Sequence, residues 1–346
     1  MIDWSTEHVL VTGGCGTIGR ELVRQLVHEL DVKSLTAIDN NESELFFDSE
    51  NYRDQPNVQF FLGDIRDRLG LSRRMQGVDT VFHTAAFKHV ILCEKAPMAA
   101  VQTNIDGVSN VIWAALTAHA KRVVFTSSDK AVNPTNVMGT SKLMGERLIT
   151  AANADSGARD CVFFSTRFGN VLGSRGSVIP LFKRQIAKGG PITLTDPEMT
   201  RFIMSVKQAV RLVIDSASLS RGGEVLVTKM PVVRIVDLAE VMIQELAPRY
   251  GHAPEEIRIQ VIGPKPGEKF YEELMTGEET RRALELERYF VIKPAFLPHF
   301  RKINYDFPVP VLSEHVTRPY NSADEPIMER SDLRAFLLEN GLLELE

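Results

Sequence analysis

One short segment, SSDKAVNPTNVMGTSK at residues 127–142, carries acidic, basic and hydroxyl side chains at spacings that could move protons. Ser128, Asp129 and Lys130 are consecutive and follow an apolar run that predicts a strand. Asp129 could protonate a departing hydroxyl group, and Lys130, if uncharged, could remove a proton from carbon. A lysine is uncharged near pH 7 only if its pKa is lowered, and nearby positive charges lower it. The alternative is a local ion pair in the turn before Pro134.

A glycine-rich loop, TGGCGTIG at residues 12–19, lies between a predicted strand and a predicted helix near the N-terminus. Its G-x-x-G-x-x-G spacing lets the backbone approach a pyrophosphate, and the start of the helix offers unpaired N–H groups and a positive dipole end to the phosphates. An ordinary glycine turn is the alternative, but the order of strand, loop and helix is the one a dinucleotide site requires. The cofactor contacts that we expect from this loop are Gly13, Gly16, Thr17, Ile18 and Gly19.

An acidic residue, Asp39, ends the second predicted strand, twenty residues after Gly19. A carboxylate there can accept both ribose hydroxyls of NAD and would repel the additional phosphate of NADP. No arginine occurs within IDNNESE, so we expect NAD rather than NADP; alternatively, Asp39 only caps the helix that begins near Glu42. Asp64 is placed either to bind the adenine amino group or to cap its loop. The other expected cofactor contacts are Asn40, Ile65, Ala85, Ala86, Lys88, Asn104 and Lys142.

Met138 and Lys142 lie four residues apart on the helix predicted over residues 136–153, and side chains at that spacing share a helix face. Lys142 could hold the nicotinamide ribose, and its charge would lower the pKa of neighbouring acids; the alternative is a solvated helix lysine. Met138 cannot exchange a hydroxyl proton, because a thioether is only a weak acceptor. The candidate catalytic residues are Ser128, Asp129, Lys130, Met138 and Lys142.

The elements that must position these residues alternate between strand and helix. Strands are predicted at 8–12, 34–39, 58–64, 78–86, 121–128 and 161–172, and helices at 17–30, 42–52, 98–120 and 136–153. This alternation predicts an α/β fold with a Rossmann-type, doubly wound parallel sheet. We expect an NAD-binding domain over residues 1–175, with segments returning to it around 200–235. Residues 176–346 would mainly form a smaller, substrate-binding domain, ending in a helix that Ser331 could cap and Gly341 could stop.

Six motifs together resemble those of extended short-chain dehydrogenases/reductases, and among them the UDP-N-acetylglucosamine 4,6-dehydratases of bacterial polysaccharide and glycan synthesis. They are TGGCGTIG, HTAAFKHV (83–90), SSDKAVNPTNVMGTSK, RFGNVLGSRGSVIPLF (167–182), LTDPEMTRFIM (194–204) and KPGEKFYEEL (265–274). The chain departs from the superfamily's usual Tyr-x-x-x-Lys pattern at Met138. A methionine there resembles the membrane-anchored dehydratases that retain configuration at C5.

The resemblance implies oxidation of the sugar at C4 by NAD, loss of water across C5 and C6, and return of the hydride to C6. Lys130 would then take the C5 proton, Asp129 would protonate the C6 oxygen, and Ser128 would bind the C4 oxygen. Because position 138 is a methionine and not a tyrosine, we expect Asp129 also to take the C4 hydroxyl proton. The expected substrate contacts are Lys88, Asn170, Arg175, Arg201, Lys265 and Glu268. Arg201 or Lys265 would neutralise the diphosphate, Glu268 would hold the uridine ribose and Asn170 would contact the diphosphate or acetamido sugar; each could instead be an ordinary surface residue, and the apolar residues around Arg201 could be core.

Composition limits the partners. The 346-residue chain has a formal net charge of -5, which gives no basic surface for nucleic acid or an anionic membrane. Its three cysteines, Cys15, Cys93 and Cys161, form neither a disulfide framework nor a metal-binding pattern. Neither a signal peptide nor an apolar run long enough to cross a bilayer is visible, so we expect a cytoplasmic protein without a membrane anchor or a metal. By analogy, it would act on a UDP-sugar as a homodimer or larger assembly.

Two other classes remain open from the sequence. A nucleotide-sugar 4-epimerase or a C5-inverting dehydratase could share the fold, although an epimerase has little use for the Asp129–Lys130 pair. A non-catalytic NAD-binding regulator would explain Met138, but it would not be expected to keep Asp129, Lys130 and Lys142 together.

Overall fold

The computed structural model describes residues 2–155, 161–174, 176–263, 269–296 and 303–345. The chain divides into two compact units. The first unit comprises residues 1–168, 210–229 and 275–319, and the second comprises residues 169–209, 230–274 and 320–346. Each unit has its own sheet and core and is described by itself.

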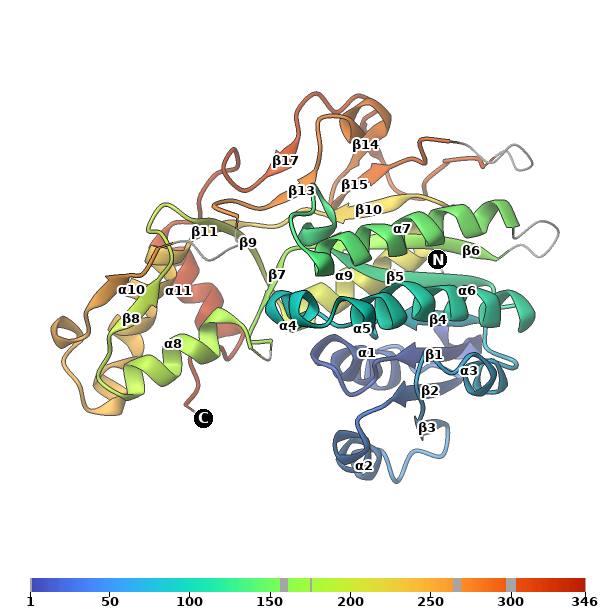
Figure 1. Ribbon diagram of the computed structural model, residues 1–346, viewed down its shortest axis with the longest axis horizontal. Helices are drawn as coiled ribbons and strands as arrows, with labels where there is room; N and C mark the ends of the chain where they lie inside the picture. The colour runs from blue at the N-terminus through green and yellow to red at the C-terminus, as the bar shows by residue number, and fades with distance from the viewer. Residues whose placement is uncertain (1, 156–160, 175, 264–268, 297–302, 346) are drawn as a thin grey trace. The chain divides into compact units, whose positions relative to one another are not determined.

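The first unit is built on a sheet that has ten strands in the described part of the chain, in the order β16-β14-β15-β10-β6-β5-β4-β1-β2-β3 (Figure 1). All pairings from β10 to β3 are parallel, whereas β14, β15 and β16 add antiparallel strands at one side. The strands are β1 His8–Thr12, β2 Ser34–Asp39, β3 Val58–Leu62, β4 Thr80–His83, β5 Arg122–Ser128, β6 Val162–Phe168, β10 Val225–Thr228, β14 Ala283–Leu286, β15 Tyr289–Ile292 and β16 Val311–Ser313. The Rossmann-type α/β fold expected from the sequence is confirmed.

Helices flank this sheet, and α6 and α7 lie side by side across one face of it (Figure 1). The helices are α1 Thr17–His28, α2 Glu42–Asn51, α3 Arg68–Arg74, α4 Val90–Lys95, α5 Pro97–Val101, α6 Gly107–Thr117, α7 Val137–Asp155 and α9 Val206–Leu219. Central strands such as β5 are buried along almost their whole length, because helices cover both faces of a parallel sheet. The core between β5 and the helices includes Phe125, Val111 and Ile149.

Three elements differ from the sequence expectation. The helix expected over 98–120 contains a π-helical turn, Gln102–Asp106, between α5 and α6. The strand expected over 161–172 ends at Phe168, and Gly169 separates it from β7, Asn170–Leu172, which pairs with β9 in the second unit. The segment around β14 and β15 was expected in the second domain, but β15 hydrogen-bonds to β10 and so extends the first unit's sheet.

The second unit has small sheets and a helical core. Its elements are β7, α8 Val178–Ala187, β8 Ile192–Leu194, β9 Thr200–Ser205, β11 Val232–Arg234, α10 Ile235–Leu246, β12 Ile259–Val261, β13 Glu273–Met275, β17 Tyr320–Asn321 and α11 Arg330–Glu339. Phe182, Leu238 and Leu337 bring α8, α10 and α11 into one apolar cluster. The N-cap of α11 is Glu329, not Ser331 as expected, because the helix begins one residue before Ser331. Gly341 follows α11 with a φ of +65°.

Within the described residues, no helix is long and apolar enough to cross a membrane. No group of three or more His, Cys, Asp or Glu side chains in that part of the chain could hold a metal ion. All three cysteines are buried, and none is part of a disulfide bond.

Candidate active site

The glycine loop connects β1 to α1 and has room for backbone alone. Gly13 has a φ of +73°, and a Cβ added there would lie 2.7 Å from the amide nitrogen of Ala85. A Cβ on Gly19 would lie 2.0 Å from the Gly13 oxygen. Helix α1 begins at Thr17, and its N-cap, Gly16, offers no side chain to the first amides. The loop thus leaves N–H groups at a helix start available to an anion, as a pyrophosphate site requires.

A pocket in the first unit lies beside this loop, where β1, β2, β3 and β4 end. It is lined by Gly13, Gly16, Ile38, Asp39, Asn40, Gly63, Asp64, Ile65, Thr84, Ala85, Ala86, Phe87 and Thr103. The expected cofactor residues from the glycine loop, from the end of β2 and from the loops after β3 and β4 therefore converge. Ligands of doubly wound sheets bind at this carboxyl edge.

Asp39 does not cap α2, because Asn41 is the N-cap residue and its side chain accepts the Glu44 amide. Instead, the Asp39 carboxylate accepts the amide of Cys15 at 2.9 Å and that of Asn41 at 2.9 Å. One carboxylate therefore ties the glycine loop to the turn after β2 and also lines the pocket.

Asp64 caps its own loop and forms an ion pair. Its Oδ1 accepts the backbone amide of Arg66 at 2.9 Å, and the Arg66 guanidinium donates from both Nε and Nη2 to the carboxylate. The Asn40 amide donates to Oδ2 at a longer distance, 3.4 Å. The hydrogen bonds from Arg66 lower the pKa of Asp64 to about 2, so this carboxylate is ionised at neutral pH.

Thr103 lines the pocket but was not predicted. It is 8% exposed, and its hydroxyl makes no hydrogen bond with the described residues. Thr103 lies in the π-helical turn, and such turns occur frequently at functional sites. Nothing in the spacing of the sequence marks a π turn, because its neighbours continue a regular helical pattern.

Asn104 and Lys88 do not line this pocket. The Asn104 side chain accepts the Phe87 amide at 2.8 Å and donates to the Phe87 oxygen and to the Ser141 hydroxyl. It therefore joins the loop after β4 to α7 and holds that loop in place. Lys88 is exposed in the same loop.

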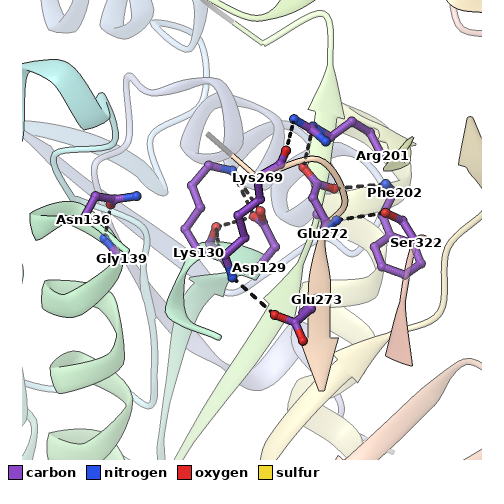
Figure 2. Close-up of polar contacts among 12 residues, drawn as sticks. Asp129, Lys130, Asn136, Gly139, Arg201, Phe202, Lys269, Glu272, Glu273 and Ser322 are labelled. Carbon is purple, nitrogen blue, oxygen red and sulfur yellow. Dashed lines mark hydrogen bonds and ion pairs between the residues drawn. The ribbon is translucent and has the colours of Figure 1, made fainter. Parts of the chain in front are cut away.

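The candidate acid–base group lies at the end of β5. Ser128 donates to Asp129 Oδ1 at 2.7 Å. Lys130 Nζ lies 3.0 and 3.1 Å from the two carboxylate oxygens of Asp129 (Figure 2). Asp129 is buried, whereas the Lys130 side chain is 36% exposed. Gly139 allows this turn to pack on α7, because a Cβ there would lie 2.3 Å from the Lys130 oxygen. The ion pair considered from the sequence is therefore present, and it joins the two residues considered as acid and base.

Lys142 lies on α7 beneath the end of β5 and is buried. Its ammonium donates to the Thr126 oxygen at 2.9 Å and lies 4.6 Å from the centre of the Phe125 ring. Burial lowers the Lys142 pKa to about 8, and Glu146 partly opposes that shift. It is thus not the solvated helix lysine of the alternative interpretation. Burial, together with the charge of Lys142, also lowers the pKa of His83 to about 3, so His83 is neutral.

Met138 is a packing residue of α7. It is 3% exposed and forms an apolar cluster with Cys93 of α4 and Ala100 of α5, against which Val90 and Val137 pack. Its thioether therefore lies among apolar side chains, and this cluster packs α4 and α5 against α7.

In the second unit, Arg201 is buried and its guanidinium is engaged internally. It donates to the backbone oxygens of Thr200 and Phe270. It also donates to the backbone oxygen of Lys269, and its Nε lies 3.3 Å from Glu272 (Figure 2). Arg201 therefore holds the segment at 269–272 onto β9 in this structure. Asn170, also in this unit, begins β7 and is half-buried, and the expected contacts Arg175, Lys265 and Glu268 lie outside the described residues.

The sheet order, the glycine loop at the end of β1 and the buried lysine of α7 define an enzyme of the extended short-chain dehydrogenase/reductase type. The chain belongs to the polysaccharide biosynthesis protein family, which matches it over residues 9–294. The solved structure of Pen from Bacillus thuringiensis superposes with a TM-score of 0.90 at 41% identity, covering 99% of this chain and 100% of that chain.

The relatives of this chain include both a dehydratase and an epimerase. A protein of Methanocaldococcus jannaschii described as an uncharacterized membrane protein is 51% identical over 286 residues, covering 83% of this chain and 85% of that protein. A UDP-N-acetylglucosamine 4,6-dehydratase (inverting) of Campylobacter jejuni is 35% identical, covering 90% and 89%. A UDP-glucose 4-epimerase of Rickettsia canadensis is 38% identical, covering 82% of each.

Proposed function

We propose that this enzyme is a nucleotide-sugar 4,6-dehydratase that converts UDP-N-acetylglucosamine to its 4-keto-6-deoxy product with NAD, retaining configuration at C5. The observation that carries the proposal is the Ser128–Asp129–Lys130 turn at the end of β5, in which a hydroxyl, a carboxyl and an amine are joined by hydrogen bonds. Dehydration needs an acid for the C6 oxygen and a base for the C5 proton. The similarity to the inverting dehydratase of Campylobacter jejuni supports the 4,6-dehydration, whereas the retained configuration at C5 rests on Met138 in place of the usual tyrosine.

The residues of the first unit fit a dinucleotide. Gly13 leaves no space for a side chain against the end of β4, the N-cap of α1 makes no side-chain hydrogen bond to the first amides of the helix, and the buried Thr103 hydroxyl can bind a ligand in the pocket. Asp39 would accept the ribose hydroxyls and disfavour NADP. Bound NAD would supply the group that accepts the hydride from C4 and later returns it to C6.

In the proposed mechanism, Asp129 accepts the C4 hydroxyl proton as the hydride leaves, because Met138 cannot. Lys130 then takes the proton from C5, which the C4 ketone has acidified, and Asp129 returns its proton to the C6 oxygen, which leaves as water. Lys130 finally returns a proton to C5 on the face from which it was taken. Ser128 holds the C4 oxygen, and Lys142 holds the nicotinamide ribose and contributes positive charge.

The second unit would bind the nucleotide of the substrate. Asn170 and Arg201 are its described candidates, and Arg175, Lys265 and Glu268 complete the expected set in this unit. Arg201 would have to exchange some of its internal hydrogen bonds for a diphosphate, whereas Asn170 would need no such exchange.

A 4-epimerase is the second candidate, favoured by the Rickettsia canadensis relative. It would oxidise C4 and return the hydride to the opposite face, with no loss of water. Asp129 would then need only to exchange the hydroxyl proton, and Lys130 would have no carbon acid to act on. The buried position of Lys142 serves either reaction, so that residue does not distinguish them.

The test is incubation of the purified protein with UDP-N-acetylglucosamine in deuterated water, followed by proton NMR and mass spectrometry. We expect loss of one water, a 6-methyl signal, deuterium at C5 and the coupling pattern of the gluco-derived 4-ketose. Asp129→Asn should abolish formation of the 4-ketone, and Arg73→Gln, at an exposed position of α3, is the matched control. Unchanged mass with an inverted C4 would establish the epimerase, and bound NAD with no turnover on any UDP-sugar would indicate a regulator.

A further inference from the structure

A buried ion network lies one helical turn beyond Lys142 on α7. The Arg167 guanidinium of β6 donates from Nε and Nη2 to the two oxygens of Glu146, both at 2.7 Å. It also donates to both oxygens of Glu279, at 2.8 and 3.0 Å. Glu279 accepts in turn from the backbone amide and the hydroxyl of Thr276. Glu146 therefore has both carboxylate oxygens fixed by a planar cation, which defines its position in the core.

The network carries one negative charge in excess, and it lies close to Lys142. One guanidinium faces two carboxylates, and all three side chains are buried. Glu146 follows Lys142 by four residues, so the two side chains share one face of α7, with Cβ atoms about 5–6 Å apart at this spacing. A carboxylate at that distance favours the charged form of a lysine. Burial alone would favour an uncharged Lys142, and Glu146 opposes that effect.

The other titratable side chains on elements packed against α7 do not supply this compensation. His83 of β4 is neutral and adds no negative charge. Asp129 is paired with Lys130 in the turn after β5, so their opposite charges largely cancel at a distance. Glu94 of α4 is exposed, and its carboxylate accepts the amide at the start of α7. Within the described residues, Glu146 is therefore the compensating carboxylate.

We propose that Glu146, fixed by Arg167, is a positioning residue for the cofactor: it keeps the buried Lys142 ammonium charged and so able to hold the nicotinamide ribose. The inference rests on the role given to Lys142 in the proposed function and names the residue that maintains it. An ammonium has three N–H donors, and the Thr126 oxygen takes one of them at 2.9 Å. The charged form offers the others to ribose hydroxyls, whereas an uncharged amine has fewer donors and makes weaker hydrogen bonds.

The first measurement follows Lys142 without cofactor or sugar. The full-length protein is labelled with ¹³C at the lysine Cε atoms, and the Lys142 signal is the one that is lost in Lys142→Met. In wild type, the pH titration of this signal should have its midpoint at about 8. In Glu146→Gln the midpoint should fall by about one pH unit or more, because the nearby opposite charge is gone. Arg167 keeps Glu279 as its counter-charge in this variant, so the variant should fold.

Glu279→Gln is the matched control, because it also breaks a buried pair with Arg167 but removes a carboxylate that does not lie on α7. It should lower Tm at least as much as Glu146→Gln does, and it should move the Lys142 midpoint by less than half as much. Glu146→Asp keeps the charge and should leave the midpoint near its wild-type value. This conservative variant keeps the inference testable if Glu146→Gln does not fold.

The second measurement is the affinity for NADH, followed by the fluorescence of NADH at pH 6 and at pH 8. When the charged lysine is the form that holds the ribose, the affinity follows the charged fraction. Glu146→Gln should bind NADH within about twofold of wild type at pH 6 and about fivefold more weakly than wild type at pH 8.

Equal shifts of the Lys142 midpoint in Glu146→Gln and Glu279→Gln, or no shift in either, would overturn the inference while leaving the dehydratase proposal standing. A lowered midpoint in Glu146→Asp, or an NADH affinity of Glu146→Gln that is reduced equally at both pH values, would have the same consequence. A wild type that binds no NADH would overturn the proposed cofactor site and, with it, the role of Lys142 in holding the ribose.

Discussion

Replacing Met138 by tyrosine would restore the usual superfamily pattern, yet the structure predicts a loss of stability and no gain in turnover. Met138 is 3% exposed and packs against Cys93 and Ala100, with Val90 and Val137 around them. A tyrosine is larger and stiffer, and overpacking of a core site costs about 1–3 kcal/mol. Its hydroxyl would enter an apolar cluster, which costs a further ~1–3 kcal/mol if no partner is reached.

The expected total is about 2–6 kcal/mol, which corresponds to a fall of roughly 5–20 °C in Tm for a unit of this size. Met138→Leu conserves volume and should cost less than ~1.5 kcal/mol. Its turnover should stay within about twofold of wild type, because in the proposed mechanism no proton passes through residue 138. Thermal unfolding followed by circular dichroism gives the first quantity, and release of the 4-keto product gives the second.

The two variants separate packing from chemistry. If Met138→Tyr unfolds at the wild-type temperature and its turnover rises, the side chain has room to reach the substrate and the packing argument is wrong. If Met138→Leu folds normally but loses turnover tenfold or more, the thioether has a chemical role that its apolar neighbours do not reveal. Met138→Leu remains informative even where Met138→Tyr fails to fold.

Three further outcomes follow from other parts of the first unit. Gly13→Ala should weaken NAD binding tenfold or more, measured by the displacement of fluorescent NADH, because the φ of +73° at Gly13 and the nearby end of β4 exclude a Cβ. Binding within twofold of wild type would contradict this. Arg167→Met should cost about 3–5 kcal/mol in urea unfolding, because it leaves the buried carboxylates of Glu146 and Glu279 without their cation, and a change below 1 kcal/mol would refute that reasoning. Burial disfavours the protonated form of Lys142 and so lowers the stability of the wild-type protein. This loss of stability is complete below the folded pKa of about 8 and disappears as pH rises through the unfolded value near 10.5. The stability advantage of Lys142→Met over wild type should therefore shrink between pH 7 and pH 10, and a constant difference would exclude the buried charge as its cause.

The cofactor half of the first unit could be predicted from sequence because its signals are local. A strand, three spaced glycines and a helix start determine a loop within eight residues, and the structure brings Gly13 and Gly16 to the pocket with Asp39. The neighbours of these residues follow from the parallel sheet, which aligns the carboxyl ends of β1, β2 and β4. A local pattern combined with one topological rule therefore predicts the arrangement.

What could not be predicted depends on contacts across long sequence separations or on a local irregularity. Thr103 enters the pocket because a π turn interrupts the helix between α5 and α6. From the sequence, Arg201 is a candidate ligand for an anion, but its guanidinium donates hydrogen bonds to the backbone oxygens of residues 269 and 270. The cluster around Met138 forms because α4 and α5 pack on α7, and no spacing within the sequence indicates that packing.

The turn after β5 shows that an ion pair and an acid–base couple need not be competing interpretations of Asp129 and Lys130. With Lys130 charged and Asp129 ionised, the pair holds one proton. The proposed reaction needs two acceptors at its start, because the C4 hydroxyl and C5 each release a proton. In the proposed mechanism, Lys130 must therefore be uncharged before it takes the C5 proton, and a positive charge nearby favours the uncharged form of a lysine. Because the two residues are adjacent and in contact at 3.0 Å, a proton gained by Asp129 also removes the counter-charge that would keep Lys130 protonated. In the proposed mechanism, the ion pair is therefore the acid–base couple itself, holding one proton more than in the state from which the reaction begins.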